Sequence, residues 1–201
     1  MTLQQELASW AFPPASEASD VPAIGTAAPH TTKLPLKTGK PTVVVFLRHC
    51  GCPFAEKTFL NLRDNANKHR DLDFYAISHS SDAATMTWLQ SLPQAGSSPH
   101  NLHVIVDDTL ETYRAWGLGP SSFVHVLSPM SMYSVWKLGQ SEGIWNRPTE
   151  SGSRWQTSGA FAVDAEGVVR WGRAAKRADD TPDFAEAVRI ITHETMSSTK
   201  L

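Results

Sequence analysis

The feature that most constrains the fold is an unbroken apolar run at residues 42–48 (TVVVFLR), which HCGCP follows at once. A run of β-branched residues without polar alternation is typical of a strand buried on both faces of a sheet. Over residues 54–68 the apolar positions recur at helical spacing, with charges between them. Proline suits the first position of a helix, where its missing N–H has no partner to lose. The sequence therefore predicts a strand, a short turn through Cys52 and a helix that starts next to Pro53.

The alternation of strand and helix continues along the chain. The further predicted strands cover residues 72–78, 102–106, 160–163 and 168–171, and the further predicted helices cover residues 3–10, 82–92, 109–116, 130–138 and 183–192. Asp82 is the predicted N-cap of its helix. This order favours a mostly parallel sheet covered on both faces, and the turn at residues 164–167 predicts a closing hairpin. The expected fold class is α/β, with a mixed central sheet and a helical insertion before the final β-hairpin.

Length and composition are those of one globular domain with additions. The chain has 201 residues, of which 41 % are hydrophobic and 19 % are charged. We expect a helix and an irregular lead-in over residues 1–21 and the domain over residues 22–193. An aromatic-rich insertion at residues 118–155 interrupts the domain, and residues 194–201 form a polar tail.

Charge and hydropathy narrow the classes of partner. The formal net charge of −2 gives no electrostatic reason to expect binding to nucleic acid or to an anionic membrane. No apolar run approaches the roughly 20 residues that span a bilayer. Residues 1–14 have neither the basic start nor the apolar middle of a signal peptide. A cytoplasmic protein is therefore expected.

The chain has only two cysteines, Cys50 and Cys52. Because they are one residue apart, a bond between them would close too small a loop to stabilise a fold. The eight histidines are scattered and there is no second cysteine pair, so no metal site is predicted. Two interpretations remain, a redox or nucleophilic thiol and a pair of buried structural thiols.

Cys52 is the predicted nucleophile because of its place at the start of a helix. Unpaired backbone N–H groups and the positive end of the helix dipole favour a thiolate there, and the thiolate is the reactive form of cysteine. Arg48 and His49 lie just upstream and could add positive charge. Ligands of open α/β sheets also bind at the carboxyl ends of the strands, where Cys52 falls. A cysteine that only fills space in the core is the alternative.

Cys50 has two interpretations that the sequence does not separate. A disulfide with Cys52 would be a strained ring, and strained disulfides are readily reduced, as a catalytic bond should be. Gly51 supplies the backbone freedom that such a ring needs. Alternatively, Cys50 ends the strand and packs into the core.

Other polar residues are predicted near the same edge of the sheet. His79 directly follows the second strand and could act as a base or orient a substrate, or be a solvated loop histidine. Gln156 and Ser158 precede the hairpin and could offer hydrogen bonds to a substrate. Asp107 and Asp108 favour a helix start over an acid/base pair.

The insertion is rich in aromatic residues, which could line an apolar substrate pocket or form a lid. They could equally be a homodimer patch or additional core. These residues are Phe123, Tyr133, Trp136, Trp145 and Trp155.

Four segments fall in an order similar to the thiol-specific antioxidant and alkyl hydroperoxide reductase superfamily, whose fold is thioredoxin-like. They are residues 21–30 (VPAIGTAAPH), 43–59 (VVVFLRHCGCPFAEKTF), 107–119 (DDTLETYRAWGLG) and 159–171 (GAFAVDAEGVVRW). The resemblance spans about residues 22 to 192. It is greatest to the peroxiredoxin-like branch with an FxRHxxC segment, which includes proteins resembling prostamide/prostaglandin F synthase.

The resemblance implies that Cys52 is the active-site cysteine of a thiol-dependent oxidoreductase. Its substrate would be a peroxide or a disulfide. No bound cofactor is implied, because Cys50 or an external thiol such as glutathione or thioredoxin would resolve the oxidised Cys52. Arg154 is the candidate for the anion-stabilising arginine of peroxiredoxins.

The sequence departs from the superfamily at three places. Val45 and His49 stand where peroxiredoxins carry Pro and Thr or Ser, so the hydroxyl that helps to hold the peroxide is absent. Ala55 breaks the thioredoxin CxxC pair, and residues 157–159 replace the loop with the cis-proline. Two other functions therefore stay open: an enzyme on the same scaffold for a bulky apolar substrate, such as an endoperoxide or a secondary metabolite, and a non-catalytic thioredoxin-fold binding module.

Overall fold

The computed structural model describes residues 3–11, 18–121, 129–148 and 151–198. The strands are β1 (Thr42–Phe46), β2 (Asp73–Ser78), β3 (Leu102–Val106), β4 (Gly159–Val163) and β5 (Val169–Ala174). The helices are α1 (Leu3–Ser9), α2 (Pro53–Lys68), α3 (Asp82–Ser91), α4 (Glu111–Ala115), α6 (Pro129–Glu142) and α7 (Phe184–Ser198).

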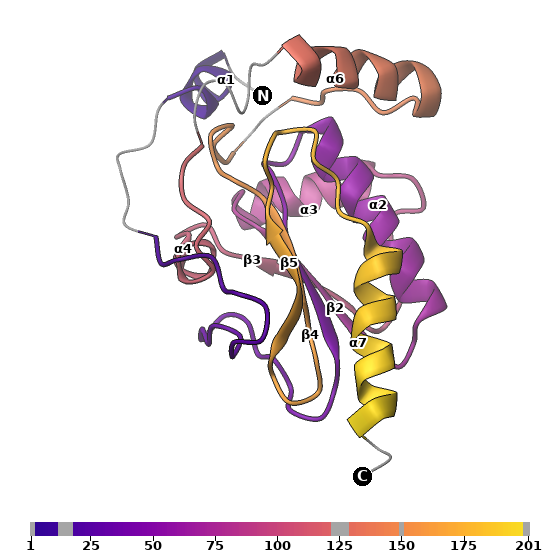
Figure 1. Ribbon diagram of the computed structural model, residues 1–201. Helices are drawn as coiled ribbons and strands as arrows, with labels where there is room; N and C mark the ends of the chain where they lie inside the picture. Colours follow the sequence, from indigo (N-terminus) through magenta and orange to yellow (C-terminus); the bar gives the residue numbers. More distant parts are fainter. Residues whose placement is uncertain (1–2, 12–17, 122–128, 149–150, 199–201) are drawn as a thin grey trace.

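The five strands form one mixed sheet in the order β3-β2-β1-β4-β5. β1, β2 and β3 are parallel, whereas β4 is antiparallel to both β1 and β5. β1 is the central strand and all five of its residues are buried. The expected α/β fold with a closing hairpin is confirmed, and the helix α6 lies before that hairpin (Figure 1).

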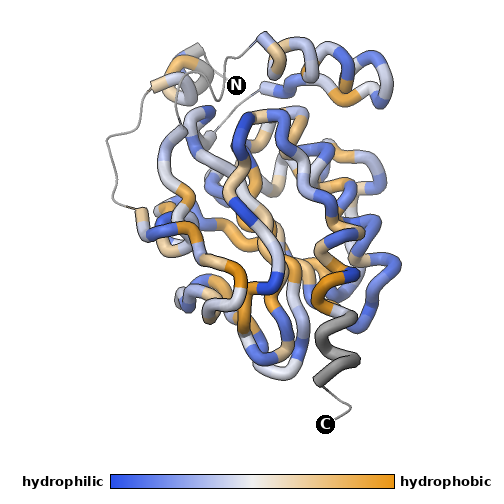
Figure 2. The backbone as a smooth tube through the Cα atoms, viewed as in Figure 1, coloured by the Kyte–Doolittle hydropathy of each residue, from blue (hydrophilic) through white to orange (hydrophobic). Residues whose placement is uncertain are grey.

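Each face of the sheet carries its own core, because neighbouring residues of a strand point to opposite faces. Val43 and Val45 belong to a cluster with apolar residues of α2, α3 and α7. Val44 and Phe46 belong to a second cluster, with residues of α4 and of the segment before β1. Hydrophobic residues accordingly concentrate along the strands in the middle of the molecule (Figure 2).

The insertion lies at one end of the molecule. Figure 1 shows α6 across the end at which α2 begins, with α1 beside it. Leu138 of α6 and Ile144 after it are buried in the same cluster as both cysteines. The insertion therefore covers the segment that leads from β1 into α2.

Several helix boundaries differ from the sequence-based prediction. Ser81, not Asp82, is the N-cap of α3, and its hydroxyl accepts a hydrogen bond from the Ala84 N–H (3.4 Å). α6 runs four residues further than residue 138, to Glu142, and α7 continues to Ser198, within the predicted polar tail. No helix within the described residues is long and apolar enough to cross a membrane.

The aromatic contacts of the second core give a stability prediction. The Phe161 ring is fully buried, with its centroid 4.9 Å from that of Trp116 and 6.1 Å from that of Phe46. Phe161→Ala is expected to lower the free energy of unfolding by about 3–5 kcal/mol, through lost burial and a new cavity. Urea unfolding measures this.

Met86→Ala on α3 is the control, because Met86 is 49 % exposed. Its expected effect is within about 0.5 kcal/mol. Equal effects of the two substitutions would contradict the assignment of Phe161 to the core.

Candidate functional site

Cys52 is the N-cap of α2, as its sequence context predicts. Its backbone is extended (φ −73°, ψ 127°), its carbonyl accepts the Glu56 N–H (3.2 Å) and Pro53 opens the helix. The amides of a first helical turn have no partner within the helix, and together with the helix dipole they favour a negative charge at this position. Cys52 is a free thiol and only 5 % exposed. A reagent that reaches this thiol must therefore pass the residues that cover it.

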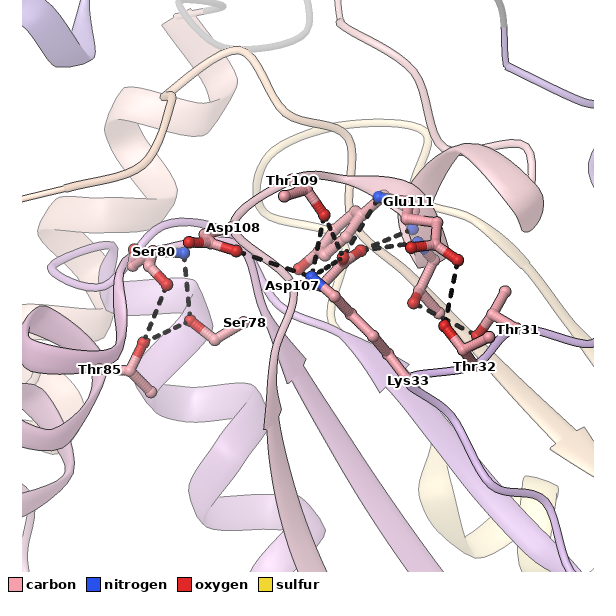
Figure 3. A network of polar contacts seen from close by, with 12 residues as sticks. Thr31, Thr32, Lys33, Ser78, Ser80, Thr85, Asp107, Asp108, Thr109 and Glu111 are labelled. Carbon is pink, nitrogen blue, oxygen red and sulfur yellow. Dashed lines mark hydrogen bonds and ion pairs between the residues drawn. The ribbon is translucent and has the colours of Figure 1, made fainter.

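Cys50 has a different environment, although it is only two residues away. Its Sγ lies 3.6 Å from the Ser78 Oγ and 3.8 Å from the Thr85 Oγ1, and its N–H donates to the Ser80 Oγ (3.0 Å). The Ser78 and Thr85 hydroxyls are themselves 2.8 Å apart (Figure 3). Burial raises the pKa of the Cys50 thiol, and the hydrogen bonds from these hydroxyls offset the effect only in part. Cys50 is thus held as a buried thiol against β2 and α3.

Arg48 is a buried cation whose guanidinium has few hydrogen-bond partners among the described residues. The side chain is 5 % exposed, and its Nη2 donates to the backbone carbonyl of Arg154 (2.7 Å). Its Nε and Nη1 are shielded from solvent and have no hydrogen-bond partner among the described residues. A guanidinium normally occupies all its N–H donors when it is buried, so these free donors mark Arg48 as unusual.

Arg154 directs its guanidinium toward the N-terminal helix. The guanidinium lies 4.7 Å from the ring centroid of Trp10, and its Nε donates to the Ser9 Oγ (3.0 Å). Its backbone N–H also donates to the Ser9 carbonyl (3.0 Å). Arg154 therefore joins the end of α1 to the loop next to Arg48.

The two histidines of the site are buried. His79 is 5 % exposed, so the solvated loop histidine is wrong. Its Nε2 lies 3.1 Å from the carbonyl oxygen and 3.2 Å from the amide nitrogen of Ser153. Burial lowers the pKa of His79 to about 4, and it lowers the pKa of His49 well below the usual value, with Arg48, Arg154 and His79 adding to the effect. Both rings are neutral at pH 7.

Residues 151–153, which the sequence analysis did not single out and which directly precede the candidate Arg154, contact His79, Ser80 and Ser81. Ser80 Oγ donates to the Ser151 carbonyl (2.9 Å), and the Ser81 N–H donates to the Ser151 Oγ (2.8 Å). Gly152 has φ +88°, and a Cβ there would lie 2.7 Å from the Ser80 Oγ. Only glycine fits this backbone and this close approach.

The insertion is attached to α2 through an ion pair that the sequence analysis also missed. Arg147 donates from Nε and Nη2 to the two carboxylate oxygens of the buried Glu56 (2.7 and 3.0 Å). Its backbone N–H donates to the carbonyl of Gly51, between the two cysteines (2.9 Å). The segment after α6 therefore fixes both the cysteine turn and the first turn of α2.

Gln156 and Ser158, the two candidate residues before the hairpin, lie in different environments. Gln156 is buried, and its Nε2 donates to the backbone carbonyls of Leu118 (2.8 Å) and Thr157 (3.2 Å). Its amide group therefore stabilises the backbone around these two residues. Ser158 lines a cavity of about 300 Å³. Arg48, Phe54 and Ala55 line the same cavity, which places it beside the start of α2.

Of the insertion's aromatic residues, the four that the structure describes do not line this cavity. Trp155 is 1 % exposed and donates its indole N–H to the Trp10 carbonyl (3.0 Å), so it is core. Tyr133, Trp136 and Trp145 are exposed. Phe123 lies outside the described residues.

Asp107 starts a helix, as the sequence predicts for this acidic pair. Its carboxylate accepts the N–H groups of Glu111, Thr112 and Tyr113 and pairs with Lys33 Nζ (3.1 Å; Figure 3). Its two oxygens are therefore occupied by the start of α4. Within the described ranges no three side chains of His, Cys, Asp or Glu gather as metal ligands do.

Comparison with solved structures agrees with this architecture. A peroxiredoxin-like protein from Aquifex aeolicus is 14 % identical, over 89 % of this chain and 91 % of its own, with a TM-score of 0.57. A thiol peroxidase from Chromobacterium violaceum is 13 % identical, over 91 % and 93 %, with a TM-score of 0.55. Peroxiredoxin 6 of Arenicola marina, in a mutant form, is 12 % identical over 80 % and 64 %, with a TM-score of 0.54.

No family model matches the chain, and no curated protein matches it in sequence. Identities of this size show a shared fold and leave the reaction open. The narrower resemblance to the FxRHxxC branch is not confirmed.

The buried histidines predict a dependence of stability on pH. Because the folded state holds His79 neutral down to about pH 4, the unfolded chain binds the extra proton between about pH 6.5 and 4. The free energy of unfolding should therefore fall as the pH is lowered through this window, by up to about 1.4 kcal/mol per pH unit for each such histidine. Denaturant unfolding at several pH values measures the slope.

His79→Gln should flatten this slope, whereas His100→Gln, at an exposed position, should leave it unchanged. A slope that is identical in all three proteins would show that His79 titrates normally in the folded state.

The mixed five-stranded sheet with helices on both faces therefore gives this chain a thioredoxin-like fold, which it shares with the solved structures of a peroxiredoxin-like protein and a thiol peroxidase.

Proposed function

We propose that this chain is a thiol-dependent oxidoreductase that uses Cys52 as its redox nucleophile, with a peroxide or a disulfide as substrate. The observation that carries the proposal is the position of Cys52 as N-cap of α2, at the carboxyl end of the central parallel strand. The helix start favours the thiolate that such chemistry needs. The fold shared with structures described as peroxiredoxin-like and thiol peroxidase supports it.

With a hydroperoxide as substrate, Cys52 is oxidised and the peroxide is reduced to an alcohol. The Cys52 thiolate sulfur attacks the terminal peroxide oxygen, the O–O bond breaks, and the alkoxide leaves and takes up a proton as an alcohol. The sulfur becomes a sulfenic acid. A second thiol then displaces water to form a disulfide, and a further thiol reduces that disulfide.

An external thiol, such as glutathione or thioredoxin, is favoured over Cys50 as the resolving group. The Cys50 thiol contacts Ser78 and Thr85, and burial raises its pKa, which opposes formation of the attacking thiolate. The proposed reaction does not require a bound cofactor. The homodimer and the cytoplasmic location stay predictions.

Intact-protein mass spectrometry after stoichiometric hydrogen peroxide tests the proposal. The wild type is expected to gain one oxygen atom, and Cys50→Ser should gain it as well. Cys52→Ser should gain none. Turnover with peroxide and an external thiol should likewise be lost in Cys52→Ser and retained in Cys50→Ser.

Two results would contradict parts of the proposed mechanism. Loss of two hydrogen atoms in the wild type would show a Cys50–Cys52 disulfide and make Cys50 the resolving thiol. Full activity of Cys52→Ser would show that Cys52 is not the nucleophile, whereas an unchanged wild-type mass would favour the binding module.

A bulky apolar substrate is the second candidate, and the cavity beside the start of α2 favours it. Phe54 and Ala55 follow Cys52 directly and line this cavity of about 300 Å³, together with apolar residues of the sheet. That volume is at the lower end of the range for small-molecule pockets. The resemblance of the FLRHCGC segment to the prostamide/prostaglandin F synthase branch points the same way.

This candidate predicts a higher kcat/KM for cumene hydroperoxide than for hydrogen peroxide, by about tenfold or more, since the ring can bury apolar area in the cavity. Steady-state assays with both oxidants and the same thiol reductant measure the ratio. A preference for hydrogen peroxide would count against the bulky substrate and leave the role of Cys52 untouched.

A further inference from the structure

We propose that the cavity between α2, the end of β1 and the β4–β5 hairpin is a binding site for a small organic monoanion, such as a medium-chain carboxylate. The anion pairs with Arg48, and the apolar part of the ligand lies against the cavity wall. The site is a binding function of its own and does not depend on any redox role of Cys52.

Arg48 supplies the reason to expect an anion. It lines the cavity, is 5 % exposed, and its guanidinium has no carboxylate within 4 Å in the described part of the chain. Two of its nitrogens, Nε and Nη1, have no hydrogen-bond partner among the residues that the structure describes. A buried cation without a counter-charge is unfavourable, so a ligand that brings both a negative charge and acceptor oxygens gains affinity.

The other charges of the cavity already have partners. Arg173 pairs with Asp180, which also accepts the Lys176 N–H (2.9 Å). Asp183 accepts the Glu186 N–H (3.0 Å), and the Glu186 carboxylate accepts the indole N–H of Trp171 (3.0 Å).

These carboxylates restrict the charge of the ligand. Asp183 and Glu186 are exposed, so they lie toward the mouth of the cavity, whereas Arg48 is buried. Their negative charge opposes a ligand with two or more negative charges. One carboxylate, placed at Arg48, is the charge that fits.

The rest of the wall is largely apolar, which sets the second property of the ligand. The apolar lining includes Val45, Phe54, Ala55, Ala160, Trp171 and Ala178. Burying alkyl or aryl groups against these residues contributes roughly 25 cal/mol per Å² of apolar surface. The volume of about 300 Å³ limits the ligand to a small one.

Binding requires a small movement of Arg48. Because Nε and Nη1 are shielded from solvent, the guanidinium must turn toward the cavity as the anion enters. The hydrogen bond from Nη2 to the Arg154 carbonyl holds the side chain near this position.

Calorimetric titration of the full-length protein at neutral pH, with octanoate and with 1-octanol, tests the proposal. The two probes have the same chain and differ in the charged head group. The wild type should bind octanoate at least about tenfold more tightly than 1-octanol, because only the carboxylate pairs with the guanidinium. This comparison needs no variant.

Arg48→Met replaces the alkyl stem of the side chain with a similar apolar chain and removes the guanidinium, so octanoate should lose about tenfold or more in affinity while 1-octanol is little affected. The Arg173→Gln/Asp180→Asn double variant removes the ion pair at the same cavity, and it should keep the preference for octanoate. Absence of octanoate binding, equal affinities of the wild type for both probes, or a preference that survives in Arg48→Met would overturn the proposal. Cys52→Ser should bind octanoate like the wild type, which separates this result from failure of the redox function.

Discussion

Burial of β1 on both faces is the constraint on which the rest of the structure depends. Its five residues are all buried, and alternate side chains enter two separate cores. Each face must therefore be covered, by α2, α3 and α7 on one side and by α4 with the preceding segment on the other. The residues from Arg48 to Cys52, which lead out of β1, are buried as well. The chain turns within them and starts α2 at Pro53, which places the thiol at a helix N-terminus.

Segments far apart in the sequence hold that turn in place. Arg147, after α6, bonds the carbonyl of Gly51 and the carboxylate of Glu56. The loop around Gly152 bonds Ser80 and His79, and Arg154 ties the same loop to the end of α1. A reactive side chain must be kept within a fraction of an ångström of its working geometry, and contacts of this kind provide such support. Cys52 is also only 5 % exposed in this arrangement, so access to the thiol is restricted.

The electrostatics of the site follow from burial. A buried imidazole is most stable when neutral, and His49 and His79 both have lowered pKa values, so they carry no charge near pH 7. Arg48 cannot lose its proton and stays a cation. One positive charge therefore remains at this end of the sheet with few partners, next to a cavity and close in sequence to the thiol. That charge is the common basis of the proposed anion site and of any attraction that brings negatively charged substrates to this end of the molecule.

The sequence by itself determined the alternation of strands and helices, the closing hairpin, the cap formed by Asp107 and the place of Cys52 between β1 and Pro53, because each depends on residues a few positions apart. It did not reveal that His79 is buried, that Ser81 caps α3, that Glu56 pairs with Arg147, or that Arg48 and Ser158 line one cavity with Trp171. The Ser81 cap is local, but the other features join residues 74 to 123 positions apart, and such contacts leave no periodic or compositional trace in a single chain. Only the tertiary structure decided them, since burial and pairing depend on which surfaces meet when the sheet is closed by its helices.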